Sequence, residues 1–133
     1  PINEAGSEFW ENLPEKPWID ELLYVVSTAV SASQHEAYLI SAPSACPSSY
    51  AGKIRWIQNR MGWGFNKFVL TSHKHLMGSP NRLLIDDRPG NCAAFRNMGG
   101  EAILFPMWGN ENRKYLDNPV VYVKEELRKL DLA

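Results

Sequence analysis

The chain has 133 residues, with 14 lysines and arginines, 15 aspartates and glutamates, and two cysteines. This length suits one ordinary domain that buries about 70% of its unfolded surface. The near-neutral charge argues against binding of nucleic acid through a basic face, and two cysteines do not make a disulfide scaffold. No apolar run approaches the roughly 20 residues of a membrane helix, and no basic segment precedes an apolar stretch at the start. We therefore expect a soluble, cytoplasmic protein that binds neither nucleic acid nor a membrane.

The first 17 residues are polar apart from a pair of aromatic residues, Phe9 and Trp10, that we expect to be buried. They predict a short helix or turn that ends at the break around Pro17. From Trp18 to about Ser33, apolar residues fall into two adjoining rows at helical spacing. So wide an apolar stripe predicts a helix that is well covered by a sheet.

From residue 37 onward, short apolar runs alternate with helical patterns. The predicted strands are residues 37–41, 68–71, 83–87, 102–105 and 120–123. One predicted helix is capped by Ser48 or Ser49 and continues to Met61. Two more run from about residue 89 to 98, with Cys92, Phe95 and Met98 facing inward, and over residues 124–132. This rhythm predicts an α/β fold, a three-layer, doubly wound and mostly parallel sheet with helices on both faces.

Polar residues stand where the predicted strands end. Ser41 and Thr71 follow two of the apolar runs, and Asp86 and Asp87 follow a third. In open parallel sheets, ligands bind beyond the carboxyl ends of the strands. These positions are therefore the candidates for a functional site.

Asp86 and Asp87 form a pair of adjacent carboxylates at the end of an apolar strand. Such a pair is costly unless something positive neutralises it, and hard oxygen ligands of this kind suit Mg²⁺. The alternative is that Asp86 caps the following helix while Asp87 faces solvent, because Asp-Asp-Arg-Pro-Gly is also good turn chemistry. Both interpretations remain open at this point.

Lys74 lies twelve residues before Asp86, in the predicted loop after the preceding strand. A lysine there can neutralise both a phosphate group and the carboxylates, although an isolated loop lysine is more often simply solvated. Ser41 offers a hydroxyl group, and the backbone amides after it can help to hold an anion. A serine at a strand end is otherwise an ordinary turn former.

Three segments, LISAPS, FVLTSHK and LLIDDRPG, resemble in this order motifs II, III and IV of the haloacid dehalogenase superfamily of phosphohydrolases. The closer resemblance is to the 5'(3')-deoxyribonucleotidases and extends from about Phe9 to Trp108. KIRWIQNRMG resembles a helix of that family with a central tryptophan. FWENLPEKP resembles the segment where the family's cap returns to its core.

The resemblance implies an Mg²⁺-dependent hydrolysis of deoxyribonucleoside monophosphates through an aspartyl-phosphate. Ser41 and Lys74 would hold the phosphoryl oxygens, with Ala42 at a position where a second hydroxyl is common. Asp87 would bind Mg²⁺, with Asp86 nearby. Residues 1–17 would be a remnant of the cap and its return linker, and Phe9 or Trp10 would pack on the base or sugar. Residues 18–133 would form the Rossmann-like core.

The family's nucleophile lies in an Asp-x-Asp motif at the end of the first strand, and no Asp-x-Asp occurs in this sequence. The resemblance therefore implies a core that lacks its first strand and is inactive alone. That strand would come from a segment upstream, or from a partner chain or oligomer that completes the sheet. The alternative is a non-catalytic protein of the same fold that binds a nucleotide, a phosphate or another protein.

Overall fold

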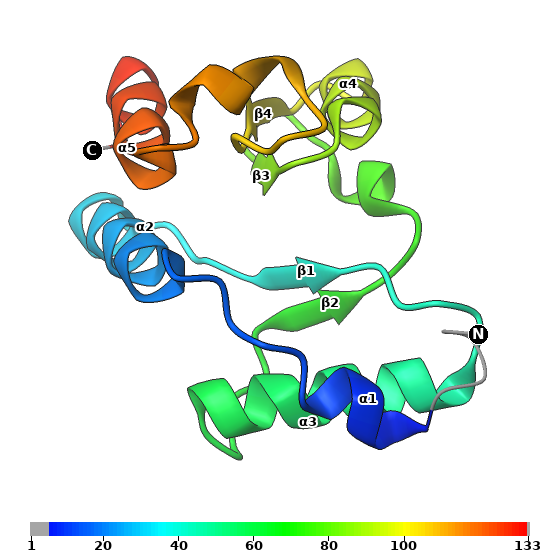
Figure 1. The fold of residues 1–133 in the computed structure, drawn as a ribbon. Helices are drawn as coiled ribbons and strands as arrows, with labels where there is room; N and C mark the ends of the chain where they lie inside the picture. Colours follow the sequence, from blue (N-terminus) through cyan, green and yellow to red (C-terminus); the bar gives the residue numbers. More distant parts are fainter. Residues whose placement is uncertain (1–5, 133) are drawn as a thin grey trace. The chain divides into compact units, whose positions relative to one another are not determined.

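The computed structural model describes residues 6–132, which divide into two compact units. Unit 1 comprises residues 6–16 and Tyr38–His73, and unit 2 comprises Pro17–Ala37 and residues 74–132. Residues 1–5 of the predicted cap remnant, and Ala133, lie outside the described part of the chain. Each unit contains one pair of short parallel strands with helices (Figure 1), so the chain is α/β and compatible with a Rossmann-like fold.

Unit 1 consists of α1 (Ser7–Glu11), β1 (Leu39–Ser41), α3 (Pro47–Met61) and β2 (Phe68–Leu70). The two strands pair in parallel, with Ile40 opposite Val69. Helix α3 begins at Pro47, which tolerates the first helical position because its missing N–H would have no partner there. The predicted cap at Ser48 or Ser49 is wrong, because the N-cap residue is Cys46. Its predicted end is confirmed, because Gly62 stops the helix with a φ of +100° that favours glycine.

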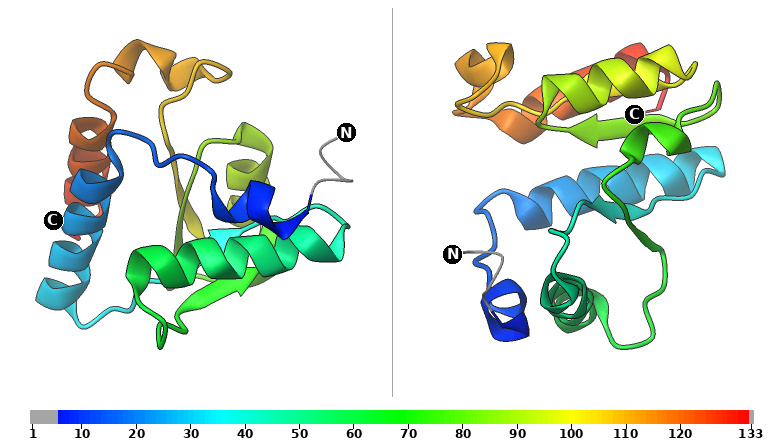
Figure 2. Two further views of the ribbon diagram at one scale, coloured as in Figure 1. Left: turned by 60° about the horizontal axis from the view of Figure 1, so that its bottom comes forward. Right: turned by 90° about the vertical axis from the view of Figure 1, so that its right-hand side faces the viewer.

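Helix α1 lies against α3 in both views of Figure 2, and Gly52 makes the close approach possible. A Cβ atom at Gly52 would lie 2.4 Å from the Ser7 carbonyl oxygen and 2.4 Å from the Trp10 Cβ. The Ser7 oxygen is a backbone atom and the Trp10 Cβ is bonded directly to the backbone, so neither atom can move aside by a side-chain rotation. This contact buries Trp10, whereas Phe9 is 45% exposed, so only half of the expected aromatic pair is buried.

We expect Gly52→Ala to destabilise unit 1 by about 1–3 kcal/mol, because the added methyl group forces α1 away from α3. The matched control is Gly64→Ala, since a Cβ at Gly64 meets nothing within 4 Å. Urea denaturation followed by tryptophan fluorescence measures both variants. Equal midpoints for the two variants would contradict the packing described for α1.

Unit 2 contains the remaining elements. They are α2 (Ile19–Ser33), η2 (Lys74–Met77), β3 (Leu83–Asp86), α4 (Pro89–Asn97), β4 (Glu101–Leu104), η3 (Glu111–Tyr115) and α5 (Pro119–Lys129). Strands β3 and β4 are parallel, with Ile85 opposite Ile103. Among the helices within residues 6–132, none is both long and apolar enough to cross a membrane.

The core of unit 2 gathers buried side chains from β4, the residue after it, and α5. Its members are Ile103, Phe105, Val123 and Leu127. Helix α2 packs on this cluster through Trp18, Leu22 and Val25, and it runs beside α5 (Figures 1 and 2). The first row of the apolar stripe predicted for residues 18–33 therefore packs on the core, although Ala29 is the only fully buried residue of α2.

Two predictions in unit 2 are wrong. Residues 120–123 are not a strand but the start of α5, which Pro119 opens at the first helical position. Val120, Val123 and Leu127 are buried at helical spacing, so burial of one helix face outweighs the strand preference of a Val-Val-Tyr-Val run. Met98 is 47% exposed rather than inward, because α4 ends at Asn97, although the neighbouring Cys92 and Phe95 are buried as predicted.

The two edges of the β3–β4 pair differ. At the outer edge of β4, Arg96 donates to the Ala102 carbonyl at 2.8 Å and Asn112 donates to the Leu104 carbonyl at 2.8 Å. These side chains occupy groups that an added strand would need. At the opposite edge, within residues 6–132, no strand pairs with β3. The sequence predicts a single sheet, whereas the described residues form two separate strand pairs, β1–β2 and β3–β4.

Candidate functional site

The predicted site residues fall into both units, and those of unit 2 lie at the carboxyl end of β3. Strand β3 is the apolar segment LLID and ends at Asp86, whose side chain is 2% exposed. Lys74, the first residue of η2, extends its ammonium group to within 2.7 Å of Asp86 Oδ2. The lysine and the carboxylate that the sequence singles out are therefore in direct contact.

Both oxygens of Asp86 are engaged. Oδ1 accepts the backbone N–H of Arg88 at 2.8 Å, which starts the turn into α4, and Oδ2 also accepts Asn91 Nδ2 at 3.2 Å. Burial by itself would raise the pKa of the Asp86 carboxyl group. The bonds from Lys74, Arg88 and Asn91, with the charge of Lys74, outweigh burial and hold that pKa below its ordinary value. Asp86 is therefore an ionised, fully bonded carboxylate that also shapes the turn.

Asp87 has the opposite environment. Its residue is exposed, and its carboxylate makes no hydrogen bond or ion pair within the described residues. Its backbone carbonyl, by contrast, accepts a hydrogen bond of 2.8 Å from Asn110 Nδ2. Of the two adjacent carboxylates, Asp87 is the one whose oxygens are available to a ligand.

In unit 1, Ser41 is the last residue of β1, and its hydroxyl oxygen accepts a hydrogen bond of 2.9 Å from Lys53 Nζ. Lys53 comes from α3 and also lies over the Trp10 ring, 5.5 Å from its centroid. The sequence reasoning did not single out Lys53. It stands twelve residues after Ser41, and the contact of the two side chains depends on how α3 packs relative to β1. Unit 1 thus presents a hydroxyl and an ammonium group together.

The loop between β1 and α3 is held by a buried hydroxyl. Ser49 is 0% exposed, and its Oγ lies 3.0 Å from the Ser44 carbonyl oxygen and 2.9 Å from that of Cys46. The hydrogen bonds from Ser48 lower the pKa of the Cys46 thiol. Ala42, in the same loop, is exposed and brings no polar side chain. The backbone of this loop is therefore fixed by side chains of α3.

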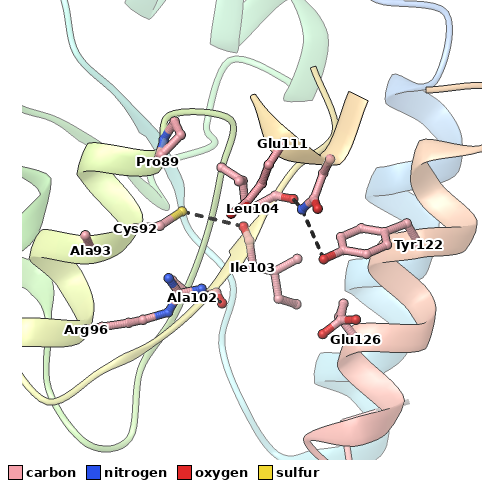
Figure 3. Close-up of a pocket in the computed structure, with 11 residues that line it drawn as sticks. Pro89, Cys92, Ala93, Arg96, Ala102, Ile103, Leu104, Glu111, Tyr122 and Glu126 are labelled. Atoms are coloured by element: carbon pink, nitrogen blue, oxygen red, sulfur yellow. Dashed lines mark hydrogen bonds between the residues drawn. The ribbon is translucent and has the colours of Figure 1, made fainter. Parts of the chain in front are cut away.

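A separate cavity of about 370 Å³ in unit 2 contains none of the predicted site residues. It lies between α4 and α5 beside β4, and Figure 3 shows Arg96, Tyr122 and Glu126 around it. Burial, followed by the charge of Glu126, raises the pKa of the Tyr122 hydroxyl. Asn112 and Arg96, which line the cavity, donate to backbone carbonyls at the edge of β4.

The described residues contain no group of three or more histidine, cysteine, aspartate or glutamate side chains that could hold a metal ion by themselves. A metal at this site would therefore need ligands beyond Asp87, from a substrate, from water or from another segment. Comparisons of the chain with protein-family models, with curated proteins and with solved structures found no match.

Proposed function

We propose that this chain supplies the phosphate-holding and magnesium-holding part of a phosphatase that acts on deoxyribonucleoside monophosphates. The observation that carries the proposal is the contact of Lys74 with Asp86 at the end of β3, next to the Asp87 carboxylate, which has no partner among residues 6–132. In the proposed enzyme, Ser41 and Lys74 bind phosphoryl oxygens. Phosphoryl transfer depends above all on positioning and on neutralising charge, which these side chains provide.

Mg²⁺ fits the donors at the end of β3. Asp86 already binds the ammonium group of Lys74 and two N–H donors, whereas the Asp87 carboxylate offers hard oxygen atoms without a partner in the described chain. Mg²⁺ is commonly held by one or two carboxylates together with water and substrate phosphate. Asp87 is therefore the residue that would bind it, and the ion would supply charge neutralisation at the phosphoryl group.

The free edge of β3 supports a larger sheet than the described residues form. Glu101 and Phe105 donate to the carbonyls of Arg82 and Asp86. Because alternate residues of a parallel strand direct their backbone groups to opposite edges, Leu83 and Ile85 direct theirs away from β4. In the proposed three-layer, doubly wound fold, a further strand pairs with this edge. The opposite edge, closed by side chains on β4, would not accept one.

We propose that this further strand carries the nucleophilic aspartate, which the chain's own sequence lacks in Asp-x-Asp form. Its carboxylate oxygen attacks phosphorus, the ester P–O bond breaks, and the leaving oxygen of the nucleoside takes a proton from a general acid. Water then hydrolyses the acyl phosphate and regenerates the carboxylate. The strand comes from a segment outside these 133 residues or from a second chain, so the chain alone is inactive.

Unit 1 adds two features to the proposal. Lys53, which donates to the Ser41 hydroxyl, places a positive charge beside the group of unit 1 that is proposed to bind phosphate. Phe9 is 45% exposed and in edge-on contact with the buried Trp10, with ring centroids 5.1 Å apart. Of these two aromatic residues, Phe9 is thus the one with a surface available to a base or sugar.

The second candidate function is a non-catalytic protein of the same fold that binds phosphate, a nucleotide or a protein partner. The absence of Asp-x-Asp from the sequence favours it. The two candidates differ in one respect that can be measured, because only the enzyme gains turnover when a strand bearing the missing motif is supplied.

The test is hydrolysis of deoxyribonucleoside monophosphates with Mg²⁺, by the chain and by a form that also carries the Asp-x-Asp segment encoded in its own gene or that of a partner. We expect turnover from the completed form alone. Lys74→Met in that form should lower kcat by about 100-fold or more, while Lys124→Met, on the exposed face of α5, should not change it. Absence of turnover from the completed form would refute the proposed enzyme.

A further inference from the structure

Asn110 is a buried polar residue, 8% exposed, in the segment between β4 and η3. Its Nδ2 donates to two backbone carbonyls, those of Asp87 and Phe105, each at 2.8 Å. Its Oδ1 accepts the backbone N–H of Asn112 at 2.9 Å and that of Met107 at 3.4 Å. The amide thus joins the loop after β3 to the loop after β4.

The chemistry of this position requires an amide. A carboxylate of the same shape accepts hydrogen bonds but donates none when ionised, and an apolar side chain does neither. Either replacement would leave buried carbonyl groups without donors, which is costly. Asn110 uses both hydrogens of its amide and also uses its oxygen, so the network around it is complete.

The bond to Asp87 has a specific consequence for the next peptide group. The Asp87 carbonyl and the Arg88 N–H belong to one planar peptide unit. Asn110 Nδ2 holds the oxygen of this unit, and Asp86 Oδ1 holds its N–H at 2.8 Å. Fixing the peptide at both ends fixes the backbone on which the Asp87 carboxylate is carried.

We propose that Asn110 is a positioning residue that sets the direction of the Asp87 carboxylate for binding of Mg²⁺. This inference rests on the proposed role of Asp87. Residues that orient the ligands of a metal typically contribute 10- to 100-fold to its affinity, about the range expected here. Asn110 acts through a backbone carbonyl, so its effect reaches the metal by way of the Asp87–Arg88 peptide.

The test compares Asn110→Asp with Asn112→Asp in the whole chain. Both variants place a carboxylate in the same segment, and Asn112 also donates two hydrogen bonds, but to Leu104 and Tyr122 instead of Asp87. The first readout is Mg²⁺ affinity by NMR titration. The second readout is hydrogen exchange of the Arg88 amide.

We expect Asn110→Asp to weaken Mg²⁺ binding about tenfold and to speed Arg88 exchange by a similar factor, while Asn112→Asp changes neither by more than about twofold. An added negative charge alone would strengthen binding of a cation, so weaker binding by Asn110→Asp is the result that lost positioning predicts. Asn110→Ala serves as a second variant if Asn110→Asp does not fold.

Unchanged affinity and unchanged Arg88 exchange in Asn110→Asp would overturn the inference. Absence of Mg²⁺ binding by the wild-type chain would instead contradict the metal-binding role of Asp87. In that case the Arg88 exchange rates still decide whether Asn110 holds the peptide, so the two failures are distinguishable.

Discussion

Replacing Lys74 by methionine is expected to lower the free energy of unfolding of unit 2 by about 3 kcal/mol, because it leaves a buried carboxylate without its counter-ion. The Asp86 side chain is 2% exposed and that of Lys74 is 14% exposed, with 2.7 Å between the charged atoms. Methionine keeps most of the apolar length of the lysine side chain and removes its charged end. Urea denaturation followed by circular dichroism at neutral pH measures the change.

The control is Lys129→Met, which breaks an ion pair of 2.9 Å with Glu126 on the surface of α5, where the lysine side chain is 70% exposed. Solvent screens this pair, so we expect a much smaller loss of stability than for Lys74→Met. A second substitution, Asp86→Asn, should recover part of the loss in Lys74→Met because it removes the unpaired charge. Equal losses from Lys74→Met and Lys129→Met would contradict the burial described for Asp86.

The same pair predicts the direction of the dependence of stability on pH. The folded-state pKa of Asp86 lies below its value in the unfolded chain. Its contribution is therefore present above the unfolded-state pKa of about 3.9 and is lost as the pH falls through the folded-state pKa. Without Lys74, that acid-dependent part of the stability of unit 2 should shrink.

The Lys74–Asp86 contact could be predicted from the sequence because both partners stand out there as charged residues at the ends of apolar runs. Lys74 begins η2 and Asp86 ends β3, twelve residues later in the same unit, so the two opposite charges are close along the chain as well as in space. Asn110 could not be found in this way. It is one asparagine within a polar segment of thirteen residues, 106–118, and only the path of the backbone shows that its amide reaches two loops. Lys53 was missed for the same reason.

The fold was predictable where an apolar run was short and bounded by turn residues, as in β1 and β3. It was not predictable at residues 120–123, where a short β-branched run is compatible with either a strand or a helix. The single sheet was inferred from the rhythm of the elements, which indicates parallel pairing but does not show which pairs adjoin. The described residues contain β1 beside β2 and β3 beside β4, and nothing in their spacing indicates a strand beside the free edge of β3.

The helical assignment of residues 120–123 leads to the largest effect that we expect from one substitution. Val123 is 0% exposed in the core of unit 2, between Ile103, Phe105 and Leu127. Val123→Asp would bury a carboxyl group with no donor, and we expect a loss of at least about 4 kcal/mol. That is a large part of the 5–15 kcal/mol that stabilises a typical domain, so unit 2 should be close to unfolding.

Val121 is the matched control, because it is 52% exposed and lies on the opposite side of α5. In a strand, Val121 and Val123 would point to the same face, and aspartate at either position would be comparably harmful. In the helix, Val121→Asp should cost less than about 1 kcal/mol, since a charge near the start of a helix is well solvated and an acidic one is favourable there. Denaturation monitored by circular dichroism compares the two variants, with Val123→Thr as a milder substitution if Val123→Asp does not fold. Similar losses at positions 121 and 123 would support a strand at residues 120–123 and would contradict the assignment of α5 as a helix of the core.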